Sequence, residues 1–284
     1  MPELPEVEIV CRHLSEKLFS QKHNEPLKLT QIKTWRKNLR YEIPKREIQR
    51  LIRLTEGNEL LEIKRRAKFI QFEFKNTVLI SHLGMTGRWS FYRGDIKNYD
   101  VQKHDHLALC FLSNVWLIYN DPRRFGFVEL INKQDLPDYF ENYGFEPLSM
   151  RHHDEVSLWE MISHLNSPIK SIIMNQKYLV GVGNIYACEA LFKEKIDPFK
   201  LPKKIKKETF FKLLSQIKKI LSDAILAGGS SIKNYRHVDL SEGNFQKMHL
   251  VYGRENQPCR ICKNQVRRKI LAGRSTFYCS ACQD

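Results

Sequence analysis

The sequence lacks the features that would place the protein in a membrane or in an oxidising compartment. No apolar run in its 284 residues approaches the roughly 18 residues of a membrane span. The first residues are acidic and rich in proline, whereas a signal peptide begins with basic residues and an apolar core. The chain has seven cysteines, and in the reducing compartment that these absences predict they are not expected to form a disulfide framework. We therefore expect a cytoplasmic protein.

Acidic residues are also in deficit. The chain has 32 Asp and Glu against 47 Lys and Arg, which is a formal net charge of +15. Such an excess predicts a polyanionic partner. Nucleic acid is a better candidate for this partner than an anionic membrane surface, because no basic amphipathic helix with an exposed aromatic face stands out. We expect a nucleic-acid partner and no membrane partner.

Repeats and low-complexity tracts are missing, and the length and the hydrophobic content of 42% suit two compact domains. The chain starts with an apolar helical stripe that consists of Val7, Val10, Cys11, Leu14 and Leu18. A basic, irregular stretch ends near Arg53. Strands are predicted at residues 27–35, 61–63, 69–74, 77–80, 107–112, 115–119 and 125–131. Short strands at hairpin spacing predict an antiparallel sandwich.

The second half of the chain has a helical pattern. Helices are predicted at residues 154–165, 167–175, 185–195 and 207–227, and Gly228 and Gly229 end the last of them. Two prolines and a glycine mark residues 134–150 as a linker. The predicted fold class is therefore α+β. The predicted parts are a β-sandwich domain at 1–133, the linker at 134–150, a helical domain at 151–240 and a small basic module at 251–284.

Four of the cysteines have the spacing of metal ligands. Two residues separate Cys259 from Cys262, and the same spacing recurs sixteen residues later at Cys279 and Cys282. This pattern is typical of a tetrahedral zinc site, in which four protein ligands leave no position open for water. The alternative interpretation is that the two cysteine pairs are unrelated and share no metal ion. We expect one structural zinc ion that holds together a segment too small to fold alone.

Gly181, Gly183 and Asn184 come directly before a predicted helix. Glycines let the backbone approach a ligand closely, and the unpaired N–H groups of a helix start favour an anion such as phosphate. The alternative is a helix cap with a tight turn.

Pro2 becomes the first residue if Met1 is removed, and its nitrogen is then a free secondary amine. An α-amino group has a reference pKa of about 8, so much more of it than of a lysine is unprotonated near neutral pH. Such an amine can form a Schiff base with an aldehyde carbon. Glu3 and Glu6 lie within a turn of it. Proline and acidic residues are, however, also ordinary at the start of a helix.

Together with further motifs, these features resemble the formamidopyrimidine-DNA glycosylase family, the bacterial base excision enzymes for 8-oxoguanine. The shared motifs follow one another along the whole chain: PELPEVE at 2–8, RRAK at 65–68, HLGM at 82–85, KHDH at 103–106, DPRRFG at 121–126, residues 180–187, 228–229 and 251–254, and GRSTFYC at 273–279. Related enzymes that prefer oxidised pyrimidines begin with PEGPE. Leu4 therefore favours the branch for purine lesions.

The resemblance implies catalytic roles at the start of the chain and in two basic motifs. The amine of Pro2 attacks the sugar C1′ of the damaged nucleotide, Glu3 acts as acid and base, and Glu6 supports them. Lys68 contacts a phosphate beside the lesion. Arg274 binds the lesion phosphates and helps the second elimination. By residue type alone, Lys68 is one cation in a basic run that water would solvate.

The resemblance also implies contacts with DNA. A nucleotide that leaves the stack creates a gap, and Met85, Arg123 and Phe125 are the implied residues that fill it, with Arg123 facing the orphaned cytosine. By residue type alone, Met85 and Phe125 are ordinary sheet core. Phosphate or backbone contacts are implied for His82, His104, Lys170, Asn184 and Tyr252.

Two departures from the family pattern affect the DNA contacts. Asn166 stands where several relatives carry a lysine, so one phosphate contact is expected to be missing. A loop between Gly229 and Val251 covers the flipped base in the family, and residues 237–249 are idiosyncratic here. The preferred lesion is therefore open.

The implied fold is an N-terminal antiparallel β-sandwich with a catalytic helix, a C-terminal helix-two-turn-helix domain and a β-hairpin zinc finger. The implied function is a monomeric, bifunctional DNA glycosylase and AP lyase of base excision repair. It would remove oxidised purines, 8-oxoguanine and formamidopyrimidines, from double-stranded DNA, act on abasic sites, and cleave the strand by β,δ-elimination through a Schiff base on Pro2. One alternative is a relative specific for oxidised pyrimidines. The other is a catalytically silent DNA-binding protein, which would need changes at Pro2, Glu3, Lys68 or Arg274, and none has changed.

Overall fold

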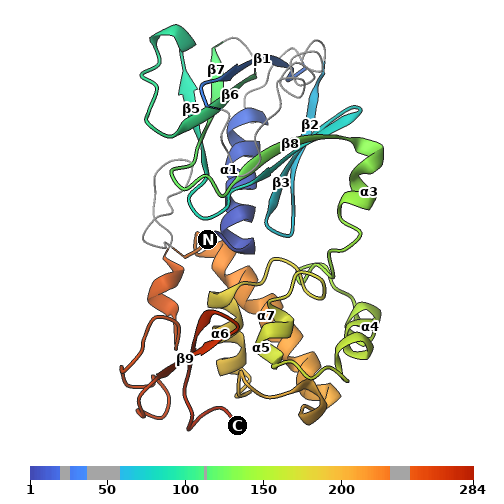
Figure 1. Cartoon of the computed structure of the whole chain (residues 1–284), viewed down its shortest axis with the longest axis vertical. Helices are drawn as coiled ribbons and strands as arrows, with labels where there is room; N and C mark the ends of the chain where they lie inside the picture. The colour runs from blue at the N-terminus through green and yellow to red at the C-terminus, as the bar shows by residue number, and fades with distance from the viewer. Residues whose placement is uncertain (20–25, 37–57, 112–113, 231–243) are drawn as a thin grey trace. The chain divides into compact units, whose positions relative to one another are not determined.

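The computed structural model of the chain describes residues 1–19, 26–36, 58–111, 114–230 and 244–284 (Figure 1). The described residues fall into two compact units. The first unit contains residues 1–2, those of 6–141, and Ser230, and the second contains 3–5, 142–229 and 244–284. The domain boundaries expected from the sequence stay a prediction. The basic stretch that ends near Arg53 and most of the loop after Gly229 lie outside the described residues.

Helix α1 (Leu4–Phe19) forms because apolar residues recur at helical spacing along one face. All five residues of the predicted stripe are at most 5% exposed, and they belong to the main hydrophobic core of the first unit. The helix predicted at the start of the chain is thus confirmed.

Two four-stranded antiparallel sheets make up most of the first unit (Figure 1). One has the order β2-β3-β4-β8, with β2 (Leu60–Arg66), β3 (Phe69–Phe74), β4 (Thr77–His82) and β8 (Phe127–Asn132). The other has the order β1-β6-β7-β5, with β1 (Leu29–Thr34), β6 (Asp105–Phe111), β7 (Val115–Asn120) and β5 (Arg88–Arg93). Side chains of both sheets and of α1 share one core. The predicted antiparallel sandwich is confirmed.

The strands differ from the sequence prediction at two places near the functional loops. Strand β8 begins at Phe127 and not at residue 125, because the N–H of Gly126 donates to the carboxylate of Asp121 and is not available to a sheet ladder. Strand β5 was not predicted. It lies at the edge of its sheet and pairs with β7 alone, so its side chains show no clear alternation of burial.

Strands β6 and β7 are buried on both faces. A second cluster, which contains Cys110 and Trp116, covers the outer face of their sheet and packs against Tyr92 and Tyr99. The short helix η1 (Ile96–Asn98) follows β5, and its Ile96 packs against this cluster. After β8, η2 (Lys133–Asp135) and α3 (Leu136–Tyr139) complete the first unit.

Helices form the body of the second unit. They are α4 (His152–Ile162), α5 (Ile169–Ile173), α6 (Asn184–Lys193) and α7 (Lys207–Leu226), with the short helices η3 (Pro202–Lys204) and η4 (Phe245–Met248). Residues 185–192 of α6 are all buried, so this helix is the centre of the unit. Gly228 and Gly229 have φ of +78° and +75°, and the N–H of Gly229 donates to Ala224 O at 2.7 Å, which ends α7 as predicted.

The C-terminal module is a hairpin with two cysteine-bearing loops. Strands β9 (Arg267–Leu271) and β10 (Arg274–Tyr278) pair antiparallel. A small core joins Val251, Val266 and Cys279 of the module to Cys188 and Phe192 of α6. The α+β fold class, with a helical second half and a C-terminal hairpin, is confirmed. None of the helices in the described part of the chain combines the length and apolarity needed to cross a membrane.

Candidate functional site

The carboxylate of Glu3 lies at the first turn of α6. The N–H of Ile185 donates to Oε1 of Glu3 at 3.0 Å, and the N–H of Tyr186 donates to Oε2 at 3.5 Å. The first N–H groups of a helix have no partner inside the helix and carry partial positive charge, so a carboxylate is stabilised there. Glu3 is only 4% exposed. The helix start therefore holds this acid in one orientation.

The glycines before α6 make room for this contact. A Cβ at Gly183 would collide with the carboxyl group of Glu3. Gly181 has φ +78°, and a Cβ there would lie 2.6 Å from Cδ1 of Leu4, whose N–H donates to Gly181 O at 3.0 Å. The sequence allowed two interpretations of this turn, a phosphate-binding site or a helix cap. The structure shows a cap, and the anion is Glu3 of the chain itself.

Lys170 joins three segments of the second unit. Its ammonium donates to Oδ1 of Asn184, at the start of α6, and to Oγ1 of Thr276 in β10 at 2.8 Å. The side-chain amide of Asn184 donates to Ser275 O at 2.8 Å. Lys170 is 1% exposed. Burial is the largest influence on the pKa of Lys170 and lowers it, and the positive charge of Arg274 acts in the same direction.

Glu189 fixes the segment that leads into the C-terminal module. Its buried carboxylate accepts from the N–H groups of Leu250, Val251 and Tyr252, at 2.8, 3.0 and 2.8 Å. Three donors compensate the cost of a buried charge. The Tyr252 hydroxyl interacts with the side chain of Asn184, and burial raises the pKa of Tyr252. The only sequence signal for Glu189 was an acid in an otherwise apolar helix.

Pro2 and Glu6 belong to the first unit. Pro2 is buried and directly precedes Glu3 in the chain. Glu6 is fully buried and accepts from the N–H of Ser230 at 2.9 Å. Ser230 is the last described residue before the gap at 231–243, which holds most of the loop expected to cover the flipped base. Glu6 therefore fixes the backbone of Ser230.

Lys68 lies in the turn between β2 and β3 and is 7% exposed. Its neighbour Ala67 has φ +54°. Arg65 supports the turn, because Nη1 donates to Ala67 O at 3.0 Å and Nε pairs with Oε2 of Glu8 at 2.9 Å. The basic run is thus not a uniformly solvated face, since the side chains of Arg65 and Lys68 are both buried.

His82 ends β4, where its ring stacks on Phe127 at a centroid distance of 5.6 Å. The N–H of Gly84 donates to Nδ1 of His82 at 3.1 Å. A ring nitrogen that accepts a hydrogen bond carries no proton, so this contact leaves Nε2 as the ring nitrogen that can donate.

The candidates for filling a gap in a DNA duplex lie in two loops of the first unit, residues 83–87 and 121–126. Phe125 is 45% exposed, and the guanidinium of Arg123 lies 4.9 Å from the centre of its ring. Met85 is half-buried. The sheet-core interpretation of Phe125 is therefore wrong, because this side chain is exposed beside an arginine and outside the strands.

Two histidines lie beside the second of these loops. His106 is 1% exposed, and its Nε2 donates to Asp121 O at 3.0 Å, since a carbonyl can only accept. Nδ1 of His106 and Nδ1 of His104 are buried and have no hydrogen-bond partner in the described part of the chain. Burial is the main cause that lowers the pKa of His106.

We expect acid to destabilise the protein through His106. Its pKa is below 6.5 in the folded state and about 6.5 in the unfolded state, so the unfolded chain takes up the proton first as the pH falls. The stability is therefore complete above about pH 6.5 and is lost as the pH falls towards the folded pKa, by at most about 1.4 kcal/mol per pH unit. Urea unfolding from pH 7.5 to 5 should show a shallower acid loss in His106→Gln than in wild type. Equal slopes would contradict this prediction.

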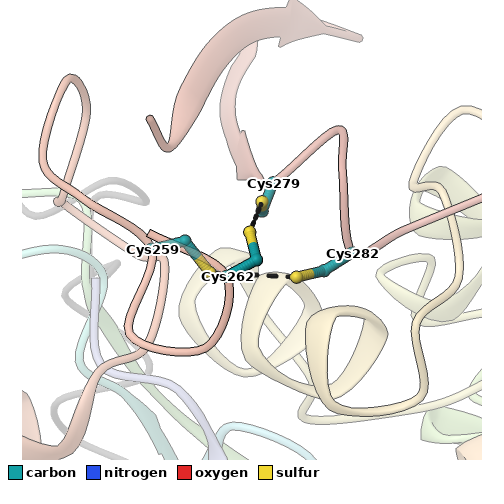
Figure 2. Close-up of side chains that lie close together, drawn as sticks. All are labelled: Cys259, Cys262, Cys279 and Cys282. Carbon is teal, nitrogen blue, oxygen red and sulfur yellow. Dashed lines mark hydrogen bonds between the residues drawn. The ribbon is translucent and has the colours of Figure 1, made fainter. Parts of the chain in front are cut away.

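The four spaced cysteines converge in the C-terminal module (Figure 2). Their sulfurs all lie within 4.8 Å of one another, with 3.9 Å between Cys259 and Cys282 and 3.4 Å between Cys262 and Cys279. A tetrahedral ion with Zn–S bonds of about 2.3 Å places its sulfurs about 3.8 Å apart. The cluster can therefore hold a metal ion, and the alternative of two unrelated pairs is wrong.

The structure gathers the candidates into separate groups. The second unit brings together Glu3, Lys170, Asn184 and Tyr252, with the charge of Arg274 acting on Lys170. The second unit also holds the four candidate metal ligands, Cys259, Cys262, Cys279 and Cys282. The first unit holds Pro2, Glu6, Lys68, His82, Met85, His104, Arg123 and Phe125. The sequence assigned no role to several residues that position these groups, namely Thr86, Asp121, Glu189 and Thr276.

Comparisons with known proteins agree along the chain. Residues 1–128 match the family model of the formamidopyrimidine-DNA glycosylase N-terminal domain, and residues 143–236 match that of the formamidopyrimidine-DNA glycosylase H2TH domain. The formamidopyrimidine-DNA glycosylases of Bdellovibrio bacteriovorus and of Wolbachia pipientis from Culex pipiens are 41% and 40% identical to the chain, each over 100% of both proteins. A similar solved structure is the complex between the Lactococcus lactis Fpg and an abasic site containing DNA, with a TM-score of 0.86, 32% identity and 99% of each chain covered.

Proposed function

Because the chain belongs to the formamidopyrimidine-DNA glycosylase family, whose members are base excision repair glycosylases with AP lyase activity, we propose that it acts on oxidised purines in double-stranded DNA. Membership makes this chain a DNA repair glycosylase. In our proposal it removes 8-oxoguanine and formamidopyrimidines through a Schiff base on Pro2 and then cleaves the strand by β,δ-elimination. It acts as a monomer in the cytoplasm, where bacterial DNA lies.

The observation that best supports this proposal is the buried carboxylate of Glu3 on the first turn of α6. Once Met1 is removed, the secondary amine of Pro2 precedes this acid by one residue. The amine forms a bond with C1′ as the bond from C1′ to the damaged base breaks, and the base leaves with a proton. Glu3 is the group proposed to move protons in this step, because a fixed carboxyl can act as general acid and base.

The sugar ring then opens: the bond from C1′ to O4′ breaks, O4′ takes up a proton, and C1′ becomes doubly bonded to the nitrogen of Pro2 as an iminium, because Pro2 is a secondary amine. The strand breaks follow from this iminium. Loss of a proton from C2′ expels the 3′ phosphate, and a second elimination expels the 5′ phosphate. An iminium favours the first loss because it withdraws electrons from the sugar carbon. The chemistry uses an amine, a carboxyl group and cations that stabilise the leaving phosphates.

The group around Lys170 is the proposed phosphate site of the second unit. An ammonium has three N–H donors, and two of those of Lys170 are used by Asn184 and Thr276. Arg274 adds a second positive charge that acts on Lys170. Two neighbouring cations, one of them buried, favour an anionic ligand. Lys68, His82, His104 and Tyr252 are proposed as further contacts with the DNA backbone.

The loops at 83–87 and 121–126 are proposed to replace the displaced nucleotide. Phe125 and Met85 supply apolar surface that can enter a base step, and Arg123 supplies donors for the base left unpaired. The exposed position of Phe125 supports this role.

The four-cysteine cluster is proposed to hold one zinc ion through Cys259, Cys262, Cys279 and Cys282. Four thiolates at these distances suit zinc and leave no ligand position for water, so the ion supplies folding free energy and no catalytic step. Strand β10 begins at Arg274, contains Thr276 and runs into Cys279. The ion thereby fixes the strand that carries part of the phosphate site.

Borohydride trapping tests the proposed chemistry. We expect that an 8-oxoguanine duplex incubated with protein and borohydride gives a covalent complex whose peptide map places the adduct on Pro2. An adduct on a lysine would show that the protein is a lyase whose nucleophile is that lysine and not Pro2. Intact DNA binding with no adduct on either 8-oxoguanine or abasic DNA would instead support the catalytically silent alternative.

The lesion preference needs a second substrate. The same single-turnover assay on a thymine glycol duplex separates the purine branch from the pyrimidine branch. We expect faster cleavage of 8-oxoguanine opposite cytosine, and equal or reversed rates would contradict the proposed specificity.

A further inference from the structure

Asp121 is a buried carboxylate at the start of the loop that carries Arg123 and Phe125. It is 0% exposed. Its Oδ2 accepts from the N–H of Gly126 at 2.8 Å, and its Oδ1 accepts from the N–H of Arg123 at 3.2 Å. Asp121 has no ion pair in the described part of the chain. A buried charge without a cation is costly unless hydrogen bonds satisfy it. The loop thus supplies the donors that this carboxylate needs.

Thr86 adds a third donor, and it comes from the other loop. The hydroxyl of Thr86 donates to Oδ1 of Asp121 and accepts from the N–H of Arg123 at 3.1 Å. Thr86 directly follows Met85. One hydroxyl therefore couples the backbone beside Met85 to the backbone of Arg123. The loops also touch directly, because a Cβ at Gly84, where φ is +59°, would collide with the backbone of Phe125 and Gly126.

We propose that Asp121 and Thr86 form a clasp that sets the position of Met85 relative to Arg123, and that this position determines how the enzyme reads the base opposite the lesion. The inference rests on the proposed function, since it matters only if Met85, Arg123 and Phe125 enter the gap in the duplex. Thr86 and Asp121 are positioning residues, because they act through the backbone of Arg123 and of the residue beside Met85.

The physical reason is preorganisation. The side chains of Arg123 and Phe125 are exposed, and only their backbone is fixed by the clasp. Side chains that must enter a base stack in one geometry lose less entropy on binding when their loops are already ordered. A guanidinium that discriminates between opposite bases also needs its backbone held in one position, because its hydrogen bonds are directional. Loss of the Thr86 hydroxyl would let the two loops move independently.

The test compares Thr86→Val, which removes the hydroxyl at nearly constant volume, with Thr86→Ser, which keeps it. We expect Thr86→Val to lower excision of 8-oxoguanine opposite cytosine by about tenfold, as loss of a hydrogen bond to a charged group implies. The preference for cytosine over adenine opposite the lesion should fall as well. Thr86→Ser should stay close to wild type in both measurements.

Two controls separate positioning from general destabilisation. Cleavage of a single-stranded oligonucleotide with an abasic site has no opposite base, so Thr86→Val should leave it unchanged. Thr30→Val makes the same chemical change in β1, where it removes a hydroxyl that donates to Cys110 O of β6 at 3.3 Å, and it should leave the opposite-base preference unchanged.

An unchanged preference in Thr86→Val, or an equal loss on single-stranded and double-stranded substrates, would overturn the clasp. A Thr86→Ser variant that behaves like Thr86→Val would do the same. Failure of the wild-type protein to excise either lesion would instead contradict the proposed function itself, so the two failures are distinguishable.

Discussion

Replacement of Glu3 by glutamine is expected to lower the rate of base excision by about 10²- to 10⁴-fold, the usual contribution of a general acid or base. Glutamine keeps the size of the side chain, and its amide oxygen can still accept from the N–H of Ile185. The cap of α6 should therefore survive while the ability to give and take a proton is lost. Single-turnover excision of 8-oxoguanine measures the loss directly.

The second readout for Glu3→Gln is the Schiff base on a preformed abasic site. No base has to leave there, so borohydride trapping should fall less than excision does. Glu16→Gln is the matched control, because it makes the same chemical change on α1 at an exposed position. Excision at the wild-type rate in Glu3→Gln would show that another residue transfers the proton. A large drop in thermal stability would show that the cap needs a carboxylate charge.

The contrast between Glu3 and the cysteines shows what the sequence could predict. The spacing of Cys259, Cys262, Cys279 and Cys282 predicts a shared metal site because each pair is local and only one hairpin has to bring the pairs together. The stripe of α1 and the run of short strands are likewise local periodicities, and the helix and the sandwich follow from them. Patterns within a few residues were therefore sufficient for the fold class.

Contacts between distant segments carry no such signal. The sequence places Glu3 in a helix start, but the helix that its carboxylate caps is α6 and not α1. The resemblance implied a phosphate or backbone contact for Lys170, but nothing in the sequence indicated that Asn184 and Thr276 bind its ammonium. Burial of a charge depends on which segments pack around it, and this is a property of the tertiary structure. Asp121 is similar, since two of the three donors to its carboxylate come from neighbouring residues and the third, Thr86, comes from another loop.

Removal of the metal should produce the other large effect, because it acts on the whole C-terminal module. Structural zinc contributes apparent binding free energies of about 10–16 kcal/mol in zinc-finger peptides at neutral pH, far more than the small core of this module can replace. That core consists mainly of Val251, Val266 and two of the cysteines against α6. Without the ion we expect the hairpin to unfold and to release Thr276 and Arg274 from the phosphate site.

Cys279→Ser tests this expectation, because Cys279 directly follows β10 and is fully buried. Elemental analysis should find one zinc per wild-type chain and almost none in the variant. Affinity for an abasic duplex and strand cleavage should each fall by at least about 100-fold, since Arg274 leaves its position and Lys170 loses the hydrogen bond to Thr276, and hydrogen bonds of charged groups contribute about 1.5–3 kcal/mol each. Cys110→Ala, a buried cysteine of the first unit, should keep both zinc and activity. A metal-free chain with full affinity for DNA would show that the packing against α6 alone maintains the hairpin.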